Sequence, residues 1–358
     1  RLVGSEMCIR DRVNTIGVIG PNANSRAALI GNYHGTSSEY ITVLEGIREE
    51  AGDDVRILYS QGCDLYKDKV ENLAWDQDRI SEAVITAENS DVVILCVGLD
   101  ETLEGEEGDT GNSDASGDKV DLHLPKVQEE LIEKVTAVGK PTIVVLMAGS
   151  AIDLNYAQDN CNGILLAWYP GARGGRAIAD LLFGKESPSG KLPVTFYKDL
   201  EGMPEFTDYS MKNRTYRYME KEALYPFGYG LTYSDTCVTE AEVVGEVSAE
   251  SDIMLKATVK NNGTVDTDEV VQVYIKDLDS PLAVRNYSLC GFKRVSLKAG
   301  EEKSVEFTIS NKAMNIVDED GNRYIAGKHF RLFAGVSQPD TRSAELTGHK
   351  PAEVEIAL

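Results

Sequence analysis

The spacing of apolar residues changes once along this chain, and that change constrains the fold more than any other feature. From residue 13 to about residue 205, short and almost wholly apolar runs alternate with amphipathic stretches. The apolar runs are residues 16–19, 55–59, 92–97, 143–147 and 164–168. Strands this apolar must be covered on both faces, so we expect an α/β sandwich with a mainly parallel sheet.

Three of the amphipathic stretches predict helices. They cover residues 38–50, residues 126–138, and a segment from about Gly175 to Gly184. In the second stretch, apolar residues recur at the spacing of one helix face, at Val127, Leu131 and Val135. Gly184 is typical of the residue just beyond a helix end.

From about Cys237 onward the apolar residues alternate with other residues. Examples are Val271, Val273 and Ile275, and the turn motifs NNG, KAGEE and EDGN separate such runs. This pattern predicts an all-β, immunoglobulin-like sandwich over residues 237–358. Residues 206–236 are rich in Tyr, Gly and Pro, and we expect an ordered connector because aromatic side chains need packing partners.

The first twelve residues, RLVGSEMCIRDR, share neither pattern and lack the apolar segment of a signal peptide. We interpret residues 1–12 as an extraneous leader, produced by sequence assembly. The predicted α/β domain is therefore residues 13–205.

Charge and cysteine content exclude several classes of protein. The formal net charge is -23, which repels nucleic acid and anionic membranes, so neither is an expected partner. No run of about 18 apolar residues predicts a membrane span. The six cysteines form no CxxC pair, and no zinc site, other metal or cofactor is expected. Cys96, inside DVVILCVGL, is predicted to be a buried free thiol.

A long acidic segment follows the apolar run at residues 92–97. It reads GLDETLEGEEGDTGNSDASGDKVDLHLP, and it follows the end of a strand, where parallel sheets bind ligands. Crowded carboxylates raise one another's pKa, as a general acid at neutral pH requires. The candidates are Glu101, Glu104, Glu106, Glu107, Asp109, Asp114 and Asp118. A solvated acidic loop is the alternative.

Other site chemistries have weaker support. A calcium loop starting at Asn112 would need Glu at its twelfth position, which is His123. The segment GVIGPNANSR lacks both GxGxxG and GxxxxGK[ST], and no GxSxG elbow occurs. Nucleotide binding and a serine nucleophile are therefore not expected.

Several motifs carry a family resemblance. WYPGARGGRAIADLLFGKESPSGKLPVTF, RTYRY, YPFGYGLTYSD and LCGFKRVSLKAGEEKSVEFTI are similar to segments of glycoside hydrolase family 3, the β-glucosidases and β-xylosidases. The resemblance covers about residues 13–336, and LEGEEG is closer to bacterial β-xylosidases. It implies an α/β sandwich followed by a fibronectin type III-like domain. It also implies a retaining mechanism, with an Asp nucleophile on an N-terminal TIM-like barrel and an acid/base Glu on the α/β sandwich.

The resemblance assigns roles to particular residues. The Gly-Glu pair of LEGEEG implies Glu106 as the general acid/base, with Glu107 and Glu104 as second choices. The family's following Asp-Arg pair is Asp118-Lys119 here, which puts a role for that position in doubt.

Two further groups of residues have a structural interpretation. Gly174 and Gly175 are interpreted as scaffold that lets a helix pack closely. Arg214, Tyr216 and Arg217 either line the sugar site or hold the connector in place.

No segment of about 250 residues is present for a barrel, before or after these domains. We therefore expect a fragment of a retaining β-glycosidase that is inactive alone. Its parent would hydrolyse terminal non-reducing β-linked xylose or glucose from oligosaccharides. The expected partners are that substrate and the missing barrel domain. The alternative is a non-catalytic carbohydrate-binding or assembly module.

Overall fold

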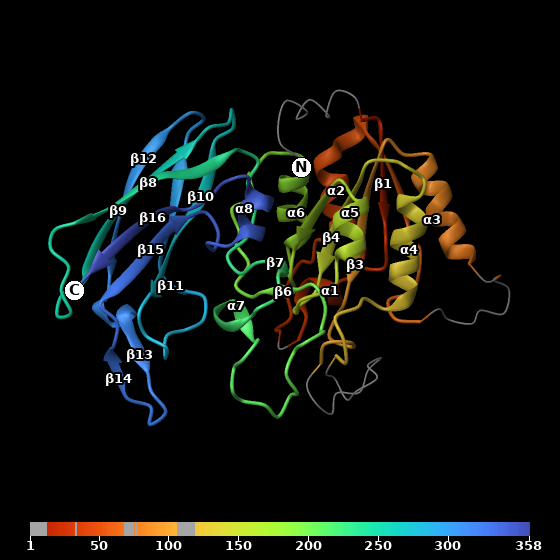
Figure 1. Cartoon of the computed structure of the whole chain (residues 1–358). Helices are drawn as coiled ribbons and strands as arrows, with labels where there is room; N and C mark the ends of the chain where they lie inside the picture. The colour runs from red at the N-terminus through yellow and green to blue at the C-terminus, as the bar shows by residue number, and fades with distance from the viewer. Residues whose placement is uncertain (1–12, 33, 68–74, 76, 106–118) are drawn as a thin grey trace. The chain divides into compact units, whose positions relative to one another are not determined.

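The computed structural model describes residues 13–32, 34–67, 75, 77–105 and 119–358. The chain divides into two compact units, of which the first ends at Glu186 and the second is Ser187–Leu358 (Figure 1). The sequence predicted that the α/β domain ends at residue 205. The first unit ends earlier, at Glu186, and the PSGKLPVTF segment therefore belongs to the second unit. No helix in the described part of the chain is long and apolar enough to cross a membrane.

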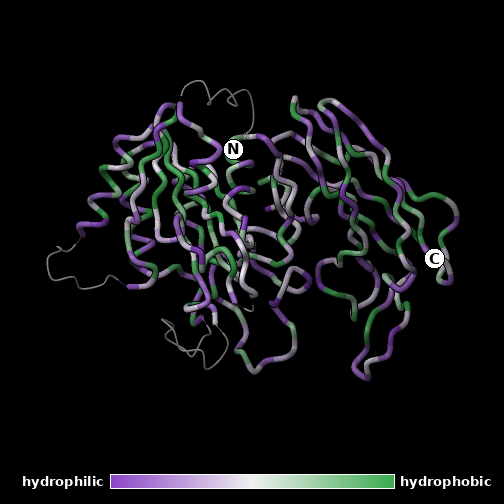
Figure 2. The backbone as a smooth tube through the Cα atoms, turned by 180° about the vertical axis from the view of Figure 1, so that it is seen from behind, coloured by the Kyte–Doolittle hydropathy of each residue, from purple (hydrophilic) through white to green (hydrophobic). Residues whose placement is uncertain are grey.

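The first unit contains the predicted parallel sheet. Its five strands are all parallel, in the order β2-β1-β3-β4-β5. They are β1 (Thr15–Ile19), β2 (Arg56–Ser60), β3 (Val92–Gly98), β4 (Thr142–Met147) and β5 (Gly163–Leu166). Each predicted apolar run forms one strand, and Figure 2 shows most of these strands as hydrophobic. Cys96 in β3 is a fully buried free thiol, as predicted, and desolvation raises its pKa.

Helices cover both faces of this sheet (Figure 1). One apolar cluster joins α2 and α6 to alternate residues of β1, β3 and β4, while α3 and α4 contact one another and the sheet. The helices are α1 (Ala27–Ile30), α2 (Val43–Ala51), α3 (Asp78–Glu88), α4 (Lys126–Thr136), α5 (Asn155–Asn160) and α6 (Gly174–Leu182), with a 3-10 turn at Gly52–Asp54. The α/β sandwich is therefore confirmed.

Helix α2 begins five residues later than residue 38, where we predicted its start. The Thr42 hydroxyl accepts a hydrogen bond from the Glu45 amide at 3.3 Å, and the Thr42 amide donates to the Glu45 carboxylate at 2.8 Å. This capping box satisfies amide groups that the first helical turn leaves without partners, so it defines the helix start. Helix α3 was not among the predicted helices.

Glycine allows α2 and α6 to pack closely. A Cβ added at Gly175 would lie 1.9 Å from the carbonyl oxygen of Thr42, and one added at Gly46 would lie 2.1 Å from the carbonyl oxygen of Gly175. Neither backbone has room for a side chain. The interpretation of Gly175 as scaffold is confirmed.

The second unit is built on two antiparallel sheets, in the orders β12-β9-β8 and β11-β10-β15-β16. Their strands are β8 (Thr236–Val244), β9 (Ile253–Asn261), β10 (Thr267–Asp277), β11 (Ser288–Leu297), β12 (Glu302–Ile309), β15 (His329–Gly335) and β16 (Ala352–Ala357). Alternate residues of these strands, including Val273, Phe307 and Phe330, form one buried core. The predicted immunoglobulin-like sandwich is confirmed.

Shorter elements complete the second unit. They are β6 (Phe196–Tyr197) paired with β7 (Ala223–Tyr225), β13 (Asn315–Val317) paired with β14 (Arg323–Ile325), α7 (Thr215–Tyr218), α8 (Thr341–Thr347), and a 3-10 turn at Asn311–Met314. The connector is ordered through its aromatic rings. The ring of Tyr216 stacks on Phe227 at 4.3 Å between centroids and meets the edge of Tyr274 at 6.1 Å.

Tyr229 provides a test of connector packing at alkaline pH. Its ring stacks on Tyr225, and burial raises its pKa to about 12. A raised pKa contributes stability that is complete below pH 10 and is lost as the pH rises toward 12. We expect the ionisation of Tyr229 to make the free energy of unfolding about 1 kcal/mol lower at pH 11 than at pH 8. Tyr229→Phe should remove that loss in urea unfolding curves.

The matched control for this test is Tyr209→Phe, because the Tyr209 side chain is 86% exposed. It should leave the pH dependence unchanged. Equal pH dependence in the wild type and in Tyr229→Phe would contradict the prediction.

Candidate acid/base site at the carboxyl edge of the parallel sheet

The carboxyl ends of β3, β4 and β5 lie together at one edge of the parallel sheet (Figure 1). The acidic segment starts there, after Gly98 at the end of β3. Glu101 and Glu104 are the acidic candidates that the structure describes. The first choice for the acid/base, Glu106, and the second choice, Glu107, lie outside the described residues, as do Asp109, Asp114 and Asp118.

The Glu104 side chain is held by three hydrogen bonds. One carboxylate oxygen, Oε2, accepts from the Gly149 amide at 2.6 Å and from the Tyr169 hydroxyl. The other, Oε1, accepts from the Ser150 hydroxyl. The donors follow β4 and β5, so one side chain ties the beginning of the acidic segment to two neighbouring strand ends. Hydrogen bonds to an ionised acceptor are stronger than neutral ones.

Tyr169 supplies one of these donors. Desolvation, reinforced by the negative charge of Glu104, raises the pKa of Tyr169 well above its usual range. The phenol therefore keeps its proton over the whole physiological pH range. The preceding residue, Trp168, has a φ of 52°, a left-handed conformation that ends the extended run of β5. This explains why β5 ends at Leu166, two residues before the end of the predicted apolar run.

Lys119 returns to the same place from the far end of the acidic segment. Its ammonium group donates to the Ser150 hydroxyl and to the carbonyl oxygen of Ala151, both at 3.2 Å. Desolvation lowers the pKa of Lys119, and the charges of Glu104 and Asp121 partly offset that effect. These contacts give Lys119 a structural role beside Glu104, and an ion-pair or substrate role for this position stays untested.

Gln128 is a buried residue of this region that our sequence reasoning missed. Its side-chain oxygen accepts from the Gly98 amide at 2.8 Å, and its side-chain nitrogen donates to the Gly98 carbonyl oxygen at 2.8 Å. The residue is fully buried in α4. It therefore fixes the last residue of β3, from which the acidic segment departs. A single polar residue on the apolar face of α4 was the available signal.

His123 takes part in a small polar cluster with two acidic residues. Its ring nitrogen Nδ1 lies 3.0 Å from Glu129 and 3.7 Å from Asp153. Within the described ranges, no group of three or more His, Cys, Asp or Glu side chains is placed to hold a metal ion.

The connector residues bind protein groups inside the second unit. The Arg214 guanidinium donates to the carbonyl oxygens of Pro204, Glu205 and Asp208, at 3.2, 2.7 and 3.2 Å. The Tyr216 hydroxyl accepts from the Leu289 amide at 2.9 Å. Arg217 lies over the Tyr216 ring, 5.9 Å from its centroid. These contacts support the interpretation that the three residues hold the connector in place.

Comparisons with known proteins agree with this architecture. The family model described as glycosyl hydrolase family 3 C-terminal domain matches residues 9–233, and the fibronectin type III-like domain matches residues 269–338. A β-xylosidase from Formosa agariphila is 33% identical over 350 residues, covering 94% of this chain and 46% of the relative. A periplasmic β-glucosidase from Salmonella typhimurium is 31% identical, covering 90% of this chain and 45% of the relative.

Solved structures give the same result. A β-glucosidase from Erythrobacter marinus superposes with a TM-score of 0.80 at 30% identity, covering 98% of this chain and 47% of that chain. A family 3 β-glucosidase from Bifidobacterium adolescentis has a TM-score of 0.81 at 27% identity, covering 99% and 51%. The chain spans about half the length of the relatives that it matches.

A parallel α/β sandwich followed by a fibronectin type III-like sandwich is the domain pair that the two family models match in this chain. The family 3 model matches more than half of the chain. The chain belongs to glycoside hydrolase family 3.

Proposed function

We propose that this chain is part of a retaining β-glycosidase that releases terminal β-linked xylose or glucose, and that Glu106 is its general acid/base. The observation that carries the proposal is the LEGEEG motif at the carboxyl end of β3, in a family 3 domain. The xylose or glucose assignment follows the relatives, which are β-xylosidases and β-glucosidases.

The reaction sets a requirement on the acid/base carboxyl. It must protonate the leaving glycosidic oxygen and then remove a proton from water, while a second carboxylate attacks the anomeric carbon. The acid/base must therefore reach the substrate with an oxygen that carries the proton. Both oxygens of Glu104 already accept hydrogen bonds from Gly149, Ser150 and Tyr169. This geometry supports Glu106 or Glu107 over Glu104 as the proton donor.

The nucleophile is proposed to lie in a part of the enzyme beyond this chain, since the matched relatives are about twice as long. The two carboxyl groups of a retaining enzyme lie only about 5–5.5 Å apart. The edge that carries LEGEEG would therefore face the domain that carries the nucleophile.

Activity of a full-length enzyme that contains this segment tests the proposal. Glu106→Gln is expected to lower kcat/KM, which reports the glycosylation step, for unactivated β-xylosides or β-glucosides by about 10²-fold or more, the usual contribution of general acid catalysis. The loss should be smaller for 4-nitrophenyl glycosides, whose leaving group needs little protonation. Glu107→Gln is the matched control. A leaving-group-dependent loss in Glu107→Gln, with Glu106→Gln active, would move the role to Glu107.

The 358-residue chain by itself should hydrolyse neither aryl β-xylosides nor aryl β-glucosides, because paired catalytic groups act as a unit. Turnover that disappears in Glu106→Gln would contradict this expectation. The alternative function, a carbohydrate-binding module, predicts saturable calorimetric binding of xylose, glucose or their β-linked disaccharides at millimolar concentration. Absence of binding would leave the module without support.

A further inference from the structure

We infer that Ser150 is a positioning residue that joins the two ends of the acidic segment, by binding Glu104 on one side and Lys119 on the other. Glu104 precedes the segment and Lys119 follows it. Both contact the same hydroxyl group. The inference rests on the proposed function only in its last step, where the segment carries the acid/base.

The polarity of this arrangement follows from the chemistry of the three groups. An ammonium group only donates hydrogen bonds and a carboxylate only accepts them, whereas a hydroxyl does both. The Ser150 proton therefore points to Glu104, and a Ser150 lone pair receives the Lys119 proton at 3.2 Å. Each bond polarises the hydroxyl in the direction that strengthens the other. Ser150 is thus a neutral bridge between two opposite charges.

Both charged groups have second anchors in the same turn after β4. The other oxygen of Glu104 accepts from the Gly149 amide at 2.6 Å, and Lys119 donates to the carbonyl oxygen of Ala151 at 3.2 Å. Three consecutive residues of one short turn therefore hold both ends of the segment. Tyr169, from the turn after β5, supplies a further hydrogen bond to Glu104.

This bridge has a consequence for catalysis. One residue holds both Glu104 and Lys119, which are fifteen residues apart in the sequence, and the proposed acid/base lies between them in the sequence. A catalytic carboxyl between these points would then depart from a fixed base. Since a misplacement of about 1 Å can cost about 10²-fold in rate, Ser150 would act on the reaction without touching the substrate.

The bridge can be tested on the 358-residue chain. We would measure urea unfolding of Glu104→Gln, Lys119→Met and their double variant, in the wild-type and Ser150→Ala backgrounds. The signal is the fluorescence of Trp168, next to Tyr169, with Trp75→Phe in every variant because Trp75 is 83% exposed. With Ser150 present, the folding equilibrium constant of the double variant should be about fivefold larger than the value obtained by multiplying the effects of the two single variants.

In the Ser150→Ala background that coupling should disappear, and in Ser150→Thr, which keeps the hydroxyl, it should return. Equal coupling with and without the hydroxyl would show direct attraction between Glu104 and Lys119, and would overturn the inference. Absence of coupling in the background that keeps Ser150 would also overturn it.

A second measurement addresses catalysis in the full-length enzyme. Ser150→Ala should lower kcat for unactivated glycosides by about tenfold with KM unchanged, and Ser150→Thr should restore most of that loss. Unchanged kcat in Ser150→Ala would remove the catalytic role. The two proposals can fail separately. If Glu104 and Lys119 show no coupling through Ser150 while Glu106→Gln loses activity, only this inference fails. If that coupling is present while Glu106→Gln keeps its activity, only the proposed role of Glu106 as acid/base fails.

Discussion

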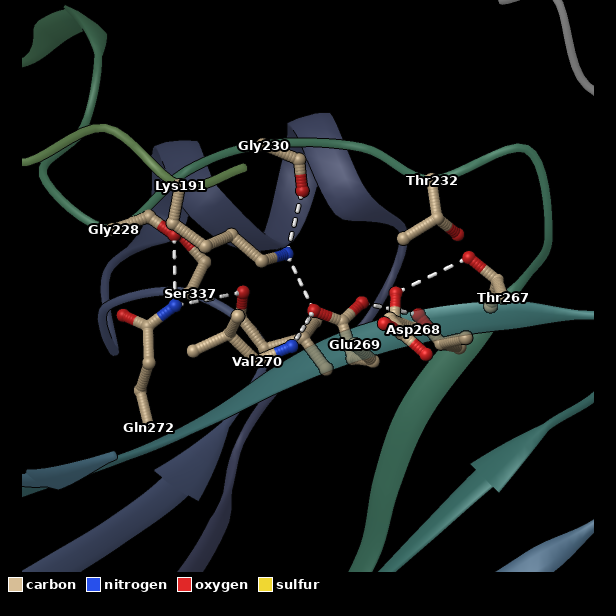
Figure 3. Close-up of polar contacts among 12 residues, drawn as sticks. Lys191, Gly228, Gly230, Thr232, Thr267, Asp268, Glu269, Val270, Gln272 and Ser337 are labelled. Carbon is tan, nitrogen blue, oxygen red and sulfur yellow. Dashed lines mark hydrogen bonds and ion pairs between the residues drawn. The ribbon is translucent and has the colours of Figure 1, made fainter. Parts of the chain in front are cut away.

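Replacing Glu269 by alanine is expected to lower the free energy of unfolding of the second unit by about 3–5 kcal/mol. Glu269 forms an ion pair with Lys191 at 2.7 Å, and the two side chains are only 2% and 8% exposed. Figure 3 shows the pair and its neighbours. The second carboxylate oxygen of Glu269 accepts from the Thr236 hydroxyl at 2.5 Å. The Lys191 ammonium also donates to the carbonyl oxygen of Gly230 at 2.6 Å.

The expected loss arises from the partner that remains. Without Glu269, the Lys191 ammonium is left inside the protein with one neutral acceptor, and the Thr236 hydroxyl loses its acceptor. Scanning calorimetry or urea unfolding would measure the change. The control is the double variant Lys191→Met with Glu269→Leu, which replaces the buried pair by apolar side chains of similar size. It should be far less destabilised.

Two results would contradict this prediction. One is a loss below 1 kcal/mol in Glu269→Ala, which would mean that water reaches the pair. The other is a double variant no more stable than Glu269→Ala. The prediction also gives the KLPVTF part of the family motif a structural role, because Lys191 ties that segment to β10 within the second unit.

Replacing Gly175 by alanine is expected to cost about 3 kcal/mol, at the upper end of the usual range for overpacking. The new methyl group would lie 1.9 Å from the carbonyl oxygen of Thr42 and 2.6 Å from that of Ile41. Both obstacles are backbone atoms at the start of α2, so no side-chain rotation relieves the clash. The better helix propensity of alanine, about 1 kcal/mol, offsets only part of this strain.

Gly35→Ala is the matched control, because a Cβ at Gly35 would meet no atom within 4 Å. Tryptophan fluorescence during urea unfolding reports the first unit, since Trp75 and Trp168 both lie in it. Gly35→Ala should unfold close to the wild type, and Gly175→Ala at clearly lower urea. Similar midpoints for the two variants would show that α2 and α6 can separate without loss.

The local sequence was sufficient for the strands, the two fold classes and the family. A strand buried on both faces needs an uninterrupted apolar run, whereas a strand with one solvent-exposed face needs apolar residues that alternate with polar ones. The five parallel strands and the β-sandwich could therefore be predicted. The start of α2 was predicted five residues too early, whereas the T-x-x-E spacing of Thr42 and Glu45, the sequence signature of a capping box, marks the true start. Helix α3 was missed, although its buried residues Ile80, Ala83 and Ala87 recur at helical spacing.

The division between the units and the role of Glu104 depend on the tertiary structure. The PSGKLPVTF segment belongs to the second unit, where Lys191 reaches a carboxylate 78 residues further along the chain. Glu104 was one of several acidic candidates in the sequence, and nothing in the motif shows that residues 119, 149, 150 and 169 surround it. Hydrogen bonds between residues far apart in sequence leave no periodic trace, so only the folded chain distinguishes an anchoring carboxylate from a proton donor.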